Sequence, residues 1–288
     1  AHKAPQIEYV KGEILSATPL EQNISQKYGL GPADRVKIKL TSGAQAGQEV
    51  NSINYKTGRP GFDIDAKVGD KIIVAVTDDR GQKLYNVADF DRQNYQYLLL
   101  AIFAACLIVF GGKIGLKSVF VIAFSILLIF YGMVSQILSS NWNIILLTLV
   151  VSAIITIVTQ VTICGWNAKA WSAILGTIGG VVIAGALASG FISLMHLTGL
   201  ESEEAMMLKA TFLSNVNFSD VLFAGIVLGA LGAVMDVAIS ISSAQNEIKI
   251  SCPHFGFKEL FKAGLNVGRD IMGTMSNTLI LAYVGSSL

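Results

Sequence analysis

The stretch from Val221 to Asn246, VLFAGIVLGALGAVMDVAISISSAQN, decides the fold of this chain. Its length meets the roughly 20 apolar residues that a helix needs to cross the hydrocarbon core of a bilayer. Asp236 is the only charged residue between Asp220 and Glu247. A carboxylate inside a bilayer is unfavourable unless it is paired, protonated or hydrated, and such residues commonly serve an ion path or a proton relay. The stretch therefore predicts a membrane helix with a polar site at Asp236.

The composition of the whole chain agrees with a membrane protein. Of its 288 residues, 52% are hydrophobic and only 14% are charged, which is too apolar for a soluble domain of this size. The first 92 residues hold 13 of the 21 Lys and Arg and 12 of the 20 Asp and Glu, whereas Ser118–Ala168 holds none. The chain thus divides into a polar head, 1–92, and an apolar body, 95–288. The abrupt ends of the sequence lead us to expect trimming, above all at the C-terminus.

The head is predicted to be an all-β domain. Arg35–Leu40 (RVKIKL) alternates apolar and polar residues, as in a half-buried strand, and Lys71–Thr77 (KIIVAVT) is a second strand. Weaker strand candidates are Ile7–Ser16, Glu49–Tyr55 and Gln82–Ala88. Five short strands favour a small barrel or sandwich of OB-like type. The head lacks a basic stripe interleaved with aromatic residues, so nucleic acid is not an expected partner.

The body is predicted to hold six helices, at 97–111, 119–138, 144–163, 170–197, 221–246 and 270–288. With the head outside the cytoplasm, the loops that would face the cytoplasm hold seven Lys or Arg: Lys113, Lys117, Lys169, Lys249, Lys258, Lys262 and Arg269. The opposite loops hold only Lys209, which matches the positive-inside rule. The expected fold class is an α-helical multi-pass membrane protein with an N-terminal, extracytoplasmic all-β domain.

Neither a metal site nor an enzyme is predicted. The spacing of Cys106, Cys164 and Cys252 matches no zinc pattern, and no cofactor motif is present. No nucleophile–base pair, HExxH motif or pair of GxGD-type aspartates is found, so an intramembrane enzyme is the weakest function class.

One face of the 221–246 helix combines small residues with the acid. Gly225, Gly229 and Gly232 share this face with Asp236 and Ser240, and small residues allow a neighbouring helix to approach closely. The face is a candidate proton, ion or substrate site. The alternative is a protonated Asp236 that only hydrogen-bonds across helices.

The 270–288 helix offers a second polar stripe. Asp270, Thr274 and Asn277 follow at i, i+4 and i+7 and are candidates for the same proton or substrate site. For Asp270 the alternative is an interfacial acid that the helix dipole favours near a helix start.

Two further helices carry residues with a packing explanation. Gly176 and Gly180 are candidate packing positions in the 170–197 helix. Thr148, Ser152 and Thr156 lie at helical spacing in the 144–163 helix, where hydroxyls commonly bond to the carbonyl four residues earlier.

The segments GALGAVMDVAISISSAQNEI (Gly229–Ile248) and GRDIMGTMSNTLILAYVG (Gly268–Gly285) resemble the YibE/F family of multi-pass prokaryotic membrane proteins. This resemblance implies a location in the prokaryotic cell membrane. The pattern around Asp236, Asp270, Thr274 and Asn277 is also distantly similar to SecD/SecF and the wider RND permeases. That similarity implies proton coupling at Asp236.

Two functions of different classes are therefore expected. The first is a permease in which Asp236 takes up a proton from a hydrated pocket between helices 221–246 and 270–288, helped by Ser240 and Asn277. The second is a scaffold or assembly subunit whose head binds an extracytoplasmic protein. Expected partners are the lipid bilayer and a second copy or a paired homologous subunit. The substrate is not encoded in any recognisable motif.

Overall fold

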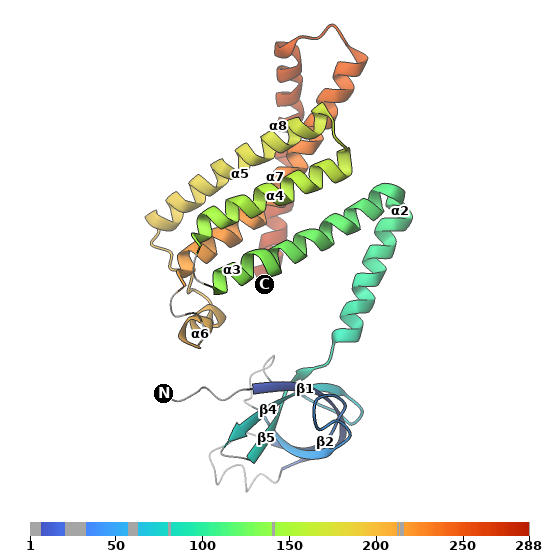
Figure 1. Cartoon of the computed structure of the whole chain (residues 1–288), viewed down its shortest axis with the longest axis vertical. Coiled ribbons are helices and arrows are strands. Elements are labelled where there is room, and N and C mark those ends of the chain that lie inside the picture. Colours follow the sequence, from blue (N-terminus) through green and yellow to red (C-terminus); the bar gives the residue numbers. More distant parts are fainter. Residues whose placement is uncertain are drawn as a thin grey trace. The chain divides into compact units, whose positions relative to one another are not determined.

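The computed structural model of the chain describes residues 7–20, 33–56, 63–79, 82–139, 142–211, 213 and 216–287. The chain forms two compact units, Ala1–Phe103 and Ala104–Leu288 (Figure 1). The division between them falls inside the first long helix.

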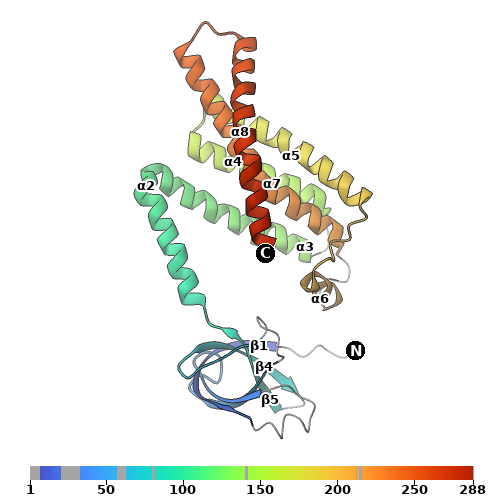
Figure 2. The same ribbon diagram turned by 180° about the vertical axis from the view of Figure 1, so that it is seen from behind.

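The first unit contains one five-stranded antiparallel sheet. Its strands are β1 (Ile7–Pro19), β2 (Ala33–Leu40), β3 (Glu49–Tyr55), β4 (Lys71–Asp79) and β5 (Gln82–Phe90), in the order β3-β2-β1-β4-β5. The sheet curls so that β3 and β5 approach each other (Figure 2), and the Ser52 hydroxyl of β3 donates to the Tyr85 carbonyl of β5. This half-barrel confirms the prediction of an all-β head, and of the two predicted architectures it is the small barrel rather than the sandwich.

The interior of the half-barrel follows from alternation along the strands. Val36, Ile38 and Leu40 are at most 1% exposed, whereas Lys37 and Lys39 point to solvent. At Gly12 in β1, an added Cβ would lie 2.6 Å from the Cγ2 atom of Ile38. A glycine is therefore required where β1 crosses this part of the core.

The rest of the chain is helical. The elements are α2 (Gln93–Leu127), the π-helical segment η1 (Leu128–Val134), α3 (Ser135–Leu138), α4 (Ile144–Cys164), α5 (Ala168–Leu194), α6 (Glu203–Thr211), α7 (Phe218–Ser251) and α8 (Phe257–Ser287). In the described part of the chain, four helical runs are long and apolar enough to cross a membrane: Gln93–Leu138, α4, α5 and α7. The expected multi-pass membrane fold agrees with this result.

The two predicted helices 97–111 and 119–138 lie within the run Gln93–Leu138, where the non-helical residue Gly112 divides one helix from the next, as expected. The φ angle of Gly112 is 54°, in the left-handed region that favours glycine. Beyond the bend, an added Cβ at Gly115 would lie 1.8 Å from the carbonyl oxygen of Leu107. Two glycines thus allow the chain to turn back closely on itself.

The last helix also differs from its prediction. α8 starts at Phe257 rather than at residue 270, so Lys258, Lys262 and Arg269 lie on the helix and not in a loop. These charges lower the apolarity of its first half, and α8 is not among the four candidate spans of the described chain. The short helix α6 was not predicted, because its sequence EEAMMLKAT is no longer than a typical loop segment.

Asparagine side chains define the starts of three membrane helices. Asn143 accepts a hydrogen bond from the backbone N–H of Leu146 at the start of α4, and Asn167 accepts one from Ala170 at the start of α5. At the start of α7, Asn217 accepts one from the backbone N–H of Ser219. Each bond satisfies an N–H group that has no partner within its helix.

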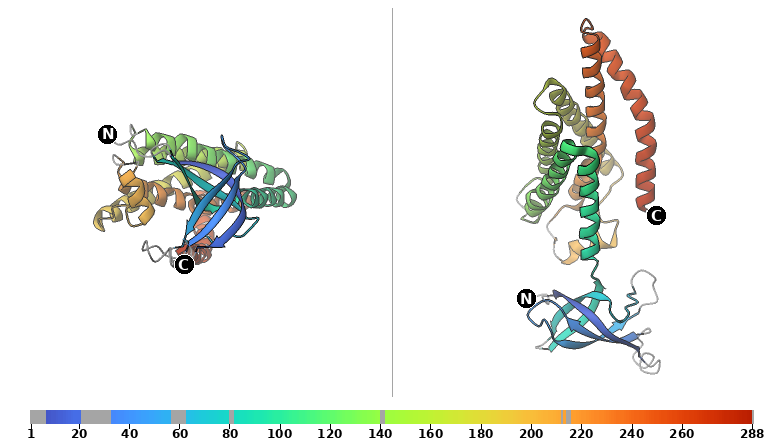
Figure 3. Two further views of the ribbon diagram at one scale, coloured as in Figure 1. Left: turned by 90° about the horizontal axis from the view of Figure 1, so that it is seen from below. Right: turned by 90° about the vertical axis from the view of Figure 1, so that its right-hand side faces the viewer.

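The core of the helical unit lies between α4, α5 and α7. Phe223, Val227 and Leu231 of α7 are at most 4% exposed and belong to one buried cluster with Val151 of α4 and Val181 of α5. Helix α8 contacts α7, and none of its described residues belongs to this core cluster. The two helices diverge from their connecting turn (Figure 3, right).

Candidate functional site

Asp236 and Ser240 lie on an exposed face of α7, which we call the glycine face because Gly225, Gly229 and Gly232 share it. An added Cβ at Gly225 or Gly232 would meet nothing within 4 Å in the described chain. At Gly229 it would lie 3.5 Å from the Tyr283 hydroxyl of α8. Most of the glycine face is therefore open to whatever surrounds the molecule.

Asp270, Thr274 and Asn277 lie on an exposed face of α8. The Thr274 hydroxyl donates to the Ile271 carbonyl at 3.0 Å, within its own helix. The other face of α8, marked by Met272 and Met275, is turned toward α7.

A groove of ≈ 720 Å³ does lie between α7 and α8, with α5 as a third wall. The residues that line this groove, however, differ from those predicted. On α7 the lining residues include Val234 and Ala238 but not Asp236. On α8 they include Met272 but not Asp270. A two-residue step turns a helical side chain by about 200°, so these acids point away from the groove. The structure thus separates the predicted crevice from the predicted polar residues.

The residues of α8 that line the groove were not predicted from the sequence. Gly268, Met272, Met275 and Leu279 follow one another at helical spacing and form one wall. The sequence contains this i, i+4, i+7, i+11 pattern, but the site was predicted on the polar stripe beside it.

Gly176 and Gly180 lie in the contact between α5 and α7. An added Cβ at Gly180 would lie 2.7 Å from the Cγ1 atom of Val234, and one at Gly176 would lie 3.7 Å from the Cβ atom of Ala238. Glycine therefore sets the close approach of these two helices.

A buried polar seam runs along α4. Thr148, Ser152, Thr156 and Gln160 are at most 2% exposed. Thr148 and Thr156 donate to the carbonyls four residues earlier, at 2.7 and 2.8 Å, as expected for threonine in a membrane helix. Ser152 and Thr177 of α5 have hydroxyl oxygens without a hydrogen-bond partner among the described residues. Ser152 and Thr156 also line a cavity of ≈ 90 Å³ between α4 and α5.

The three cysteines are free thiols: Cys106 is exposed, whereas Cys164 and Cys252 are half-buried. The Cys164 thiol lies 3.9 Å from the Gln160 side-chain oxygen. Across the described ranges, no three His, Cys, Asp or Glu side chains gather as metal ligands would.

One lysine of the described head, Lys56, forms ion pairs with two carboxylates. Its ammonium group lies 2.7 Å from Asp65 and 2.9 Å from Asp34. The hydrogen bond from Lys56 holds the pKa of the Asp65 carboxyl below its ordinary value, and the same bonds raise the pKa of Lys56. The cluster ties β2 to the segment before β4.

The apolar spans and the half-barrel together define a multi-pass helical membrane protein with an N-terminal β domain. The chain belongs to the YibE/F family: the family model described as YibE/F-like protein matches residues 99–288, which is the helical region. Searches of curated proteins and of solved structures found no match. The distant similarity to SecD/SecF and RND permeases gains no support from these comparisons, so proton coupling stays a prediction.

Proposed function

We propose that the chain is a permease-like membrane protein in which Asp236 binds and releases a proton. The observation that carries the proposal is the position of this acid on the open glycine face of α7, the same helix whose other side forms a wall of the groove. Asp236 lies eleven residues before Glu247, or about 16 Å along the helix, well inside the apolar span. The proposal assigns no enzymatic activity.

The physical basis is the cost of a charge in lipid. An ionised carboxylate at this depth must be hydrated or covered by protein, whereas a neutral one tolerates apolar surroundings. Each proton bound or released by Asp236 therefore changes which environment α7 prefers. Movement of α7 along the glycine-lined contact with α5 would alter the groove, where we place the substrate.

The proposed orientation follows the charges. The head lies outside the cytoplasm, and the end of the helical unit that carries Lys169, Lys249 and the first half of α8 faces the cytoplasm of a prokaryotic cell. Labelling of cysteines introduced on each side of the membrane in intact cells tests this orientation.

The proton site is tested with the full chain in lipid nanodiscs. Infrared difference spectra between acid and alkaline pH report the carbonyl band of each protonated carboxylic acid. We expect Asp236→Asn to remove one such band. The matched control is Asp220→Asn, in the first turn of α7, and it should keep that band. In proteoliposomes with a pH-sensitive dye, the same variant should lose proton uptake. An unchanged spectrum and unchanged uptake in a well-folded Asp236→Asn protein would overturn the proposal.

A second candidate function is an assembly subunit that transports nothing. It is favoured by the openness of the glycine face, which a helix of a second copy or of a homologous subunit would cover. The head would then bind an extracytoplasmic protein. In this case Gly232→Leu changes the oligomeric state in detergent and Asp236→Asn leaves proton uptake alone. Gly179→Leu is the control, since a Cβ at Gly179 also meets nothing within 4 Å.

A further inference from the structure

The groove between α5, α7 and α8 is apolar over most of its length. Val234 and Ile241 form the α7 side, and Met272, Met275 and Leu279 form the α8 side. Its volume of ≈ 720 Å³ lies within the range of roughly 300–1,000 Å³ that is usual for small-molecule sites. Methionine side chains adapt to flexible apolar ligands because they are unbranched and polarizable.

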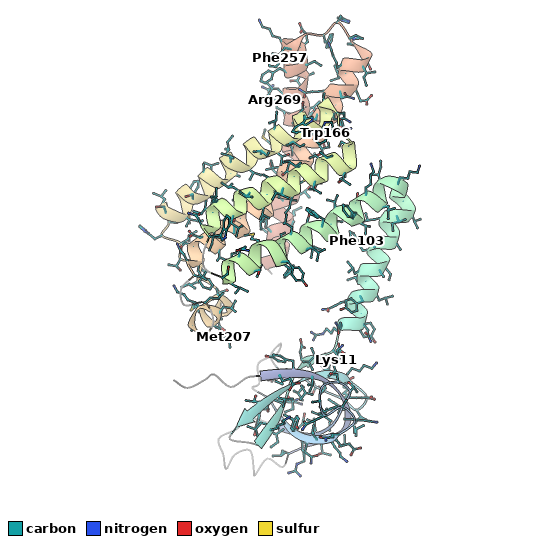
Figure 4. The ribbon with its side chains drawn as sticks, in the orientation of Figure 1. Lys11, Phe103, Trp166, Met207, Phe257 and Arg269 are labelled. Carbon is teal, nitrogen blue, oxygen red and sulfur yellow. The ribbon has the colours of Figure 1, made fainter. Side chains whose placement is uncertain are left out.

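The groove adjoins a second hollow of ≈ 300 Å³, which we call the polar hollow because Lys169, Asn246 and Lys249 line it. The two spaces adjoin, because both are lined by Ser172, Ser242, Gln245 and Phe261. The polar hollow adds Lys169 at the start of α5 and Lys249 near the end of α7. Figure 4 shows Trp166, Phe257 and Arg269 at this same end of the helical unit.

The charged side chains that line the two spaces are all positive in the described part of the chain. Lys169 and Lys249 line the hollow and Arg269 lines the groove, whereas no Asp or Glu of the described chain lines either space. Lys249 also donates to the Pro253 and Phe255 carbonyls, both at 2.7 Å, which holds its ammonium group at the hollow. Within the described residues, none of the three cations forms an ion pair.

We propose that the polar hollow and the adjoining groove together bind an anionic glycerophospholipid from the membrane. The phosphate lies at Lys169 and Lys249, which line the same hollow, because cationic side chains at a membrane surface attract anionic headgroups. The ester region meets the hydroxyls of Ser172 and Ser242, and an acyl chain follows the groove past Met272 and Met275. That this lipid is the substrate rests on the proposed permease function, whereas its binding does not.

Binding is measured by native mass spectrometry of the full chain, titrated with phosphatidylglycerol or with zwitterionic phosphatidylcholine. We expect retained phosphatidylglycerol and little phosphatidylcholine. Lys169→Gln and Lys249→Gln should each weaken binding by about fivefold. The matched controls are Lys258→Gln and Lys262→Gln, which remove cations of α8 that line neither space. Ser276→Phe, which places a large ring in the groove, should also reduce binding.

Several results would overturn the inference. Equal binding of the two lipids would show no role for the cationic end, and equal losses in the variants and controls would show only general attraction to positive charge. A dimer that Ser276→Phe dissociates, without bound lipid, would make the groove an interface between copies. Proton uptake measured on the same samples separates the two proposals. Uptake without lipid binding refutes only the lipid, and lipid binding without uptake refutes only the proton site.

Discussion

The contact between α5 and α7 gives the sharpest test of the packing. In Gly180→Ala, the new Cβ would lie 2.7 Å from the Cγ1 atom of Val234, so a helix or a side chain must shift. Valine in a helix has essentially one favourable rotamer and moves aside poorly. Overpacking of this kind costs about 1–3 kcal/mol, against a gain of about 1 kcal/mol from the higher helix propensity of alanine.

The matched control is Gly179→Ala, because a Cβ there meets nothing within 4 Å. Both variants gain the same helix propensity, so the difference between them isolates the steric cost and should be about 1–3 kcal/mol. The assay is reversible unfolding in mixed micelles, followed by circular dichroism. Adding Val234→Ala to Gly180→Ala should recover part of the loss, as a double-mutant cycle would show. Equal stability of Gly180→Ala and Gly179→Ala would refute the close contact.

Three further variants test local features. Thr177→Val removes a buried hydroxyl that has no partner in the described chain, and should raise the free energy of unfolding by about 1–3 kcal/mol; a decrease would reveal a hidden partner. Gly112→Ala places a side chain at φ 54° and should cost about 1–3 kcal/mol in the same assay, although nothing lies within 4 Å of its Cβ. Lys56→Met should raise the pKa of Asp65 toward its ordinary value of 3.8, as an NMR titration of the head would report. In the wild type, the ion pair of Lys56 and Asp65 contributes its full stabilisation when the pH is above the ordinary pKa of Asp65. This contribution to the free energy of unfolding is lost as the pH falls through the lowered pKa, and the variant should not show this pH-dependent loss.

Local patterns predicted the elements well where one physical rule dominates. The alternation in Arg35–Leu40 and the apolar run in Lys71–Thr77 lie in strands β2 and β4, and the three weaker candidates are strands as well. The long apolar stretches became helices whose starts coincide with asparagine caps. The predicted break between the helices 97–111 and 119–138 lies beside Gly112, whose φ and ψ angles are not helical.

Helix bounds and helix faces were predicted less well where a helix carries both charged and apolar residues. The first half of α8 carries charged residues such as Lys258 and Arg269, and it was taken for a loop segment before a helix. The site on this helix was predicted at the polar residues Asp270 and Asn277, whereas Met272 and Met275 line the groove. Residue type alone does not say which side of a helix meets a neighbour.

The amino-acid sequence by itself determined a β head, a helical membrane region and an acid in the middle of a span, because these follow from local periodicity and from the cost of charge in lipid. Only the tertiary structure decided that Asp236 faces outward from α7 while the groove opens on its other side. The reason is that the rotation of each helix about its axis is set by which side chains interlock, such as Gly180 against Val234, and such contacts join residues far apart in the chain.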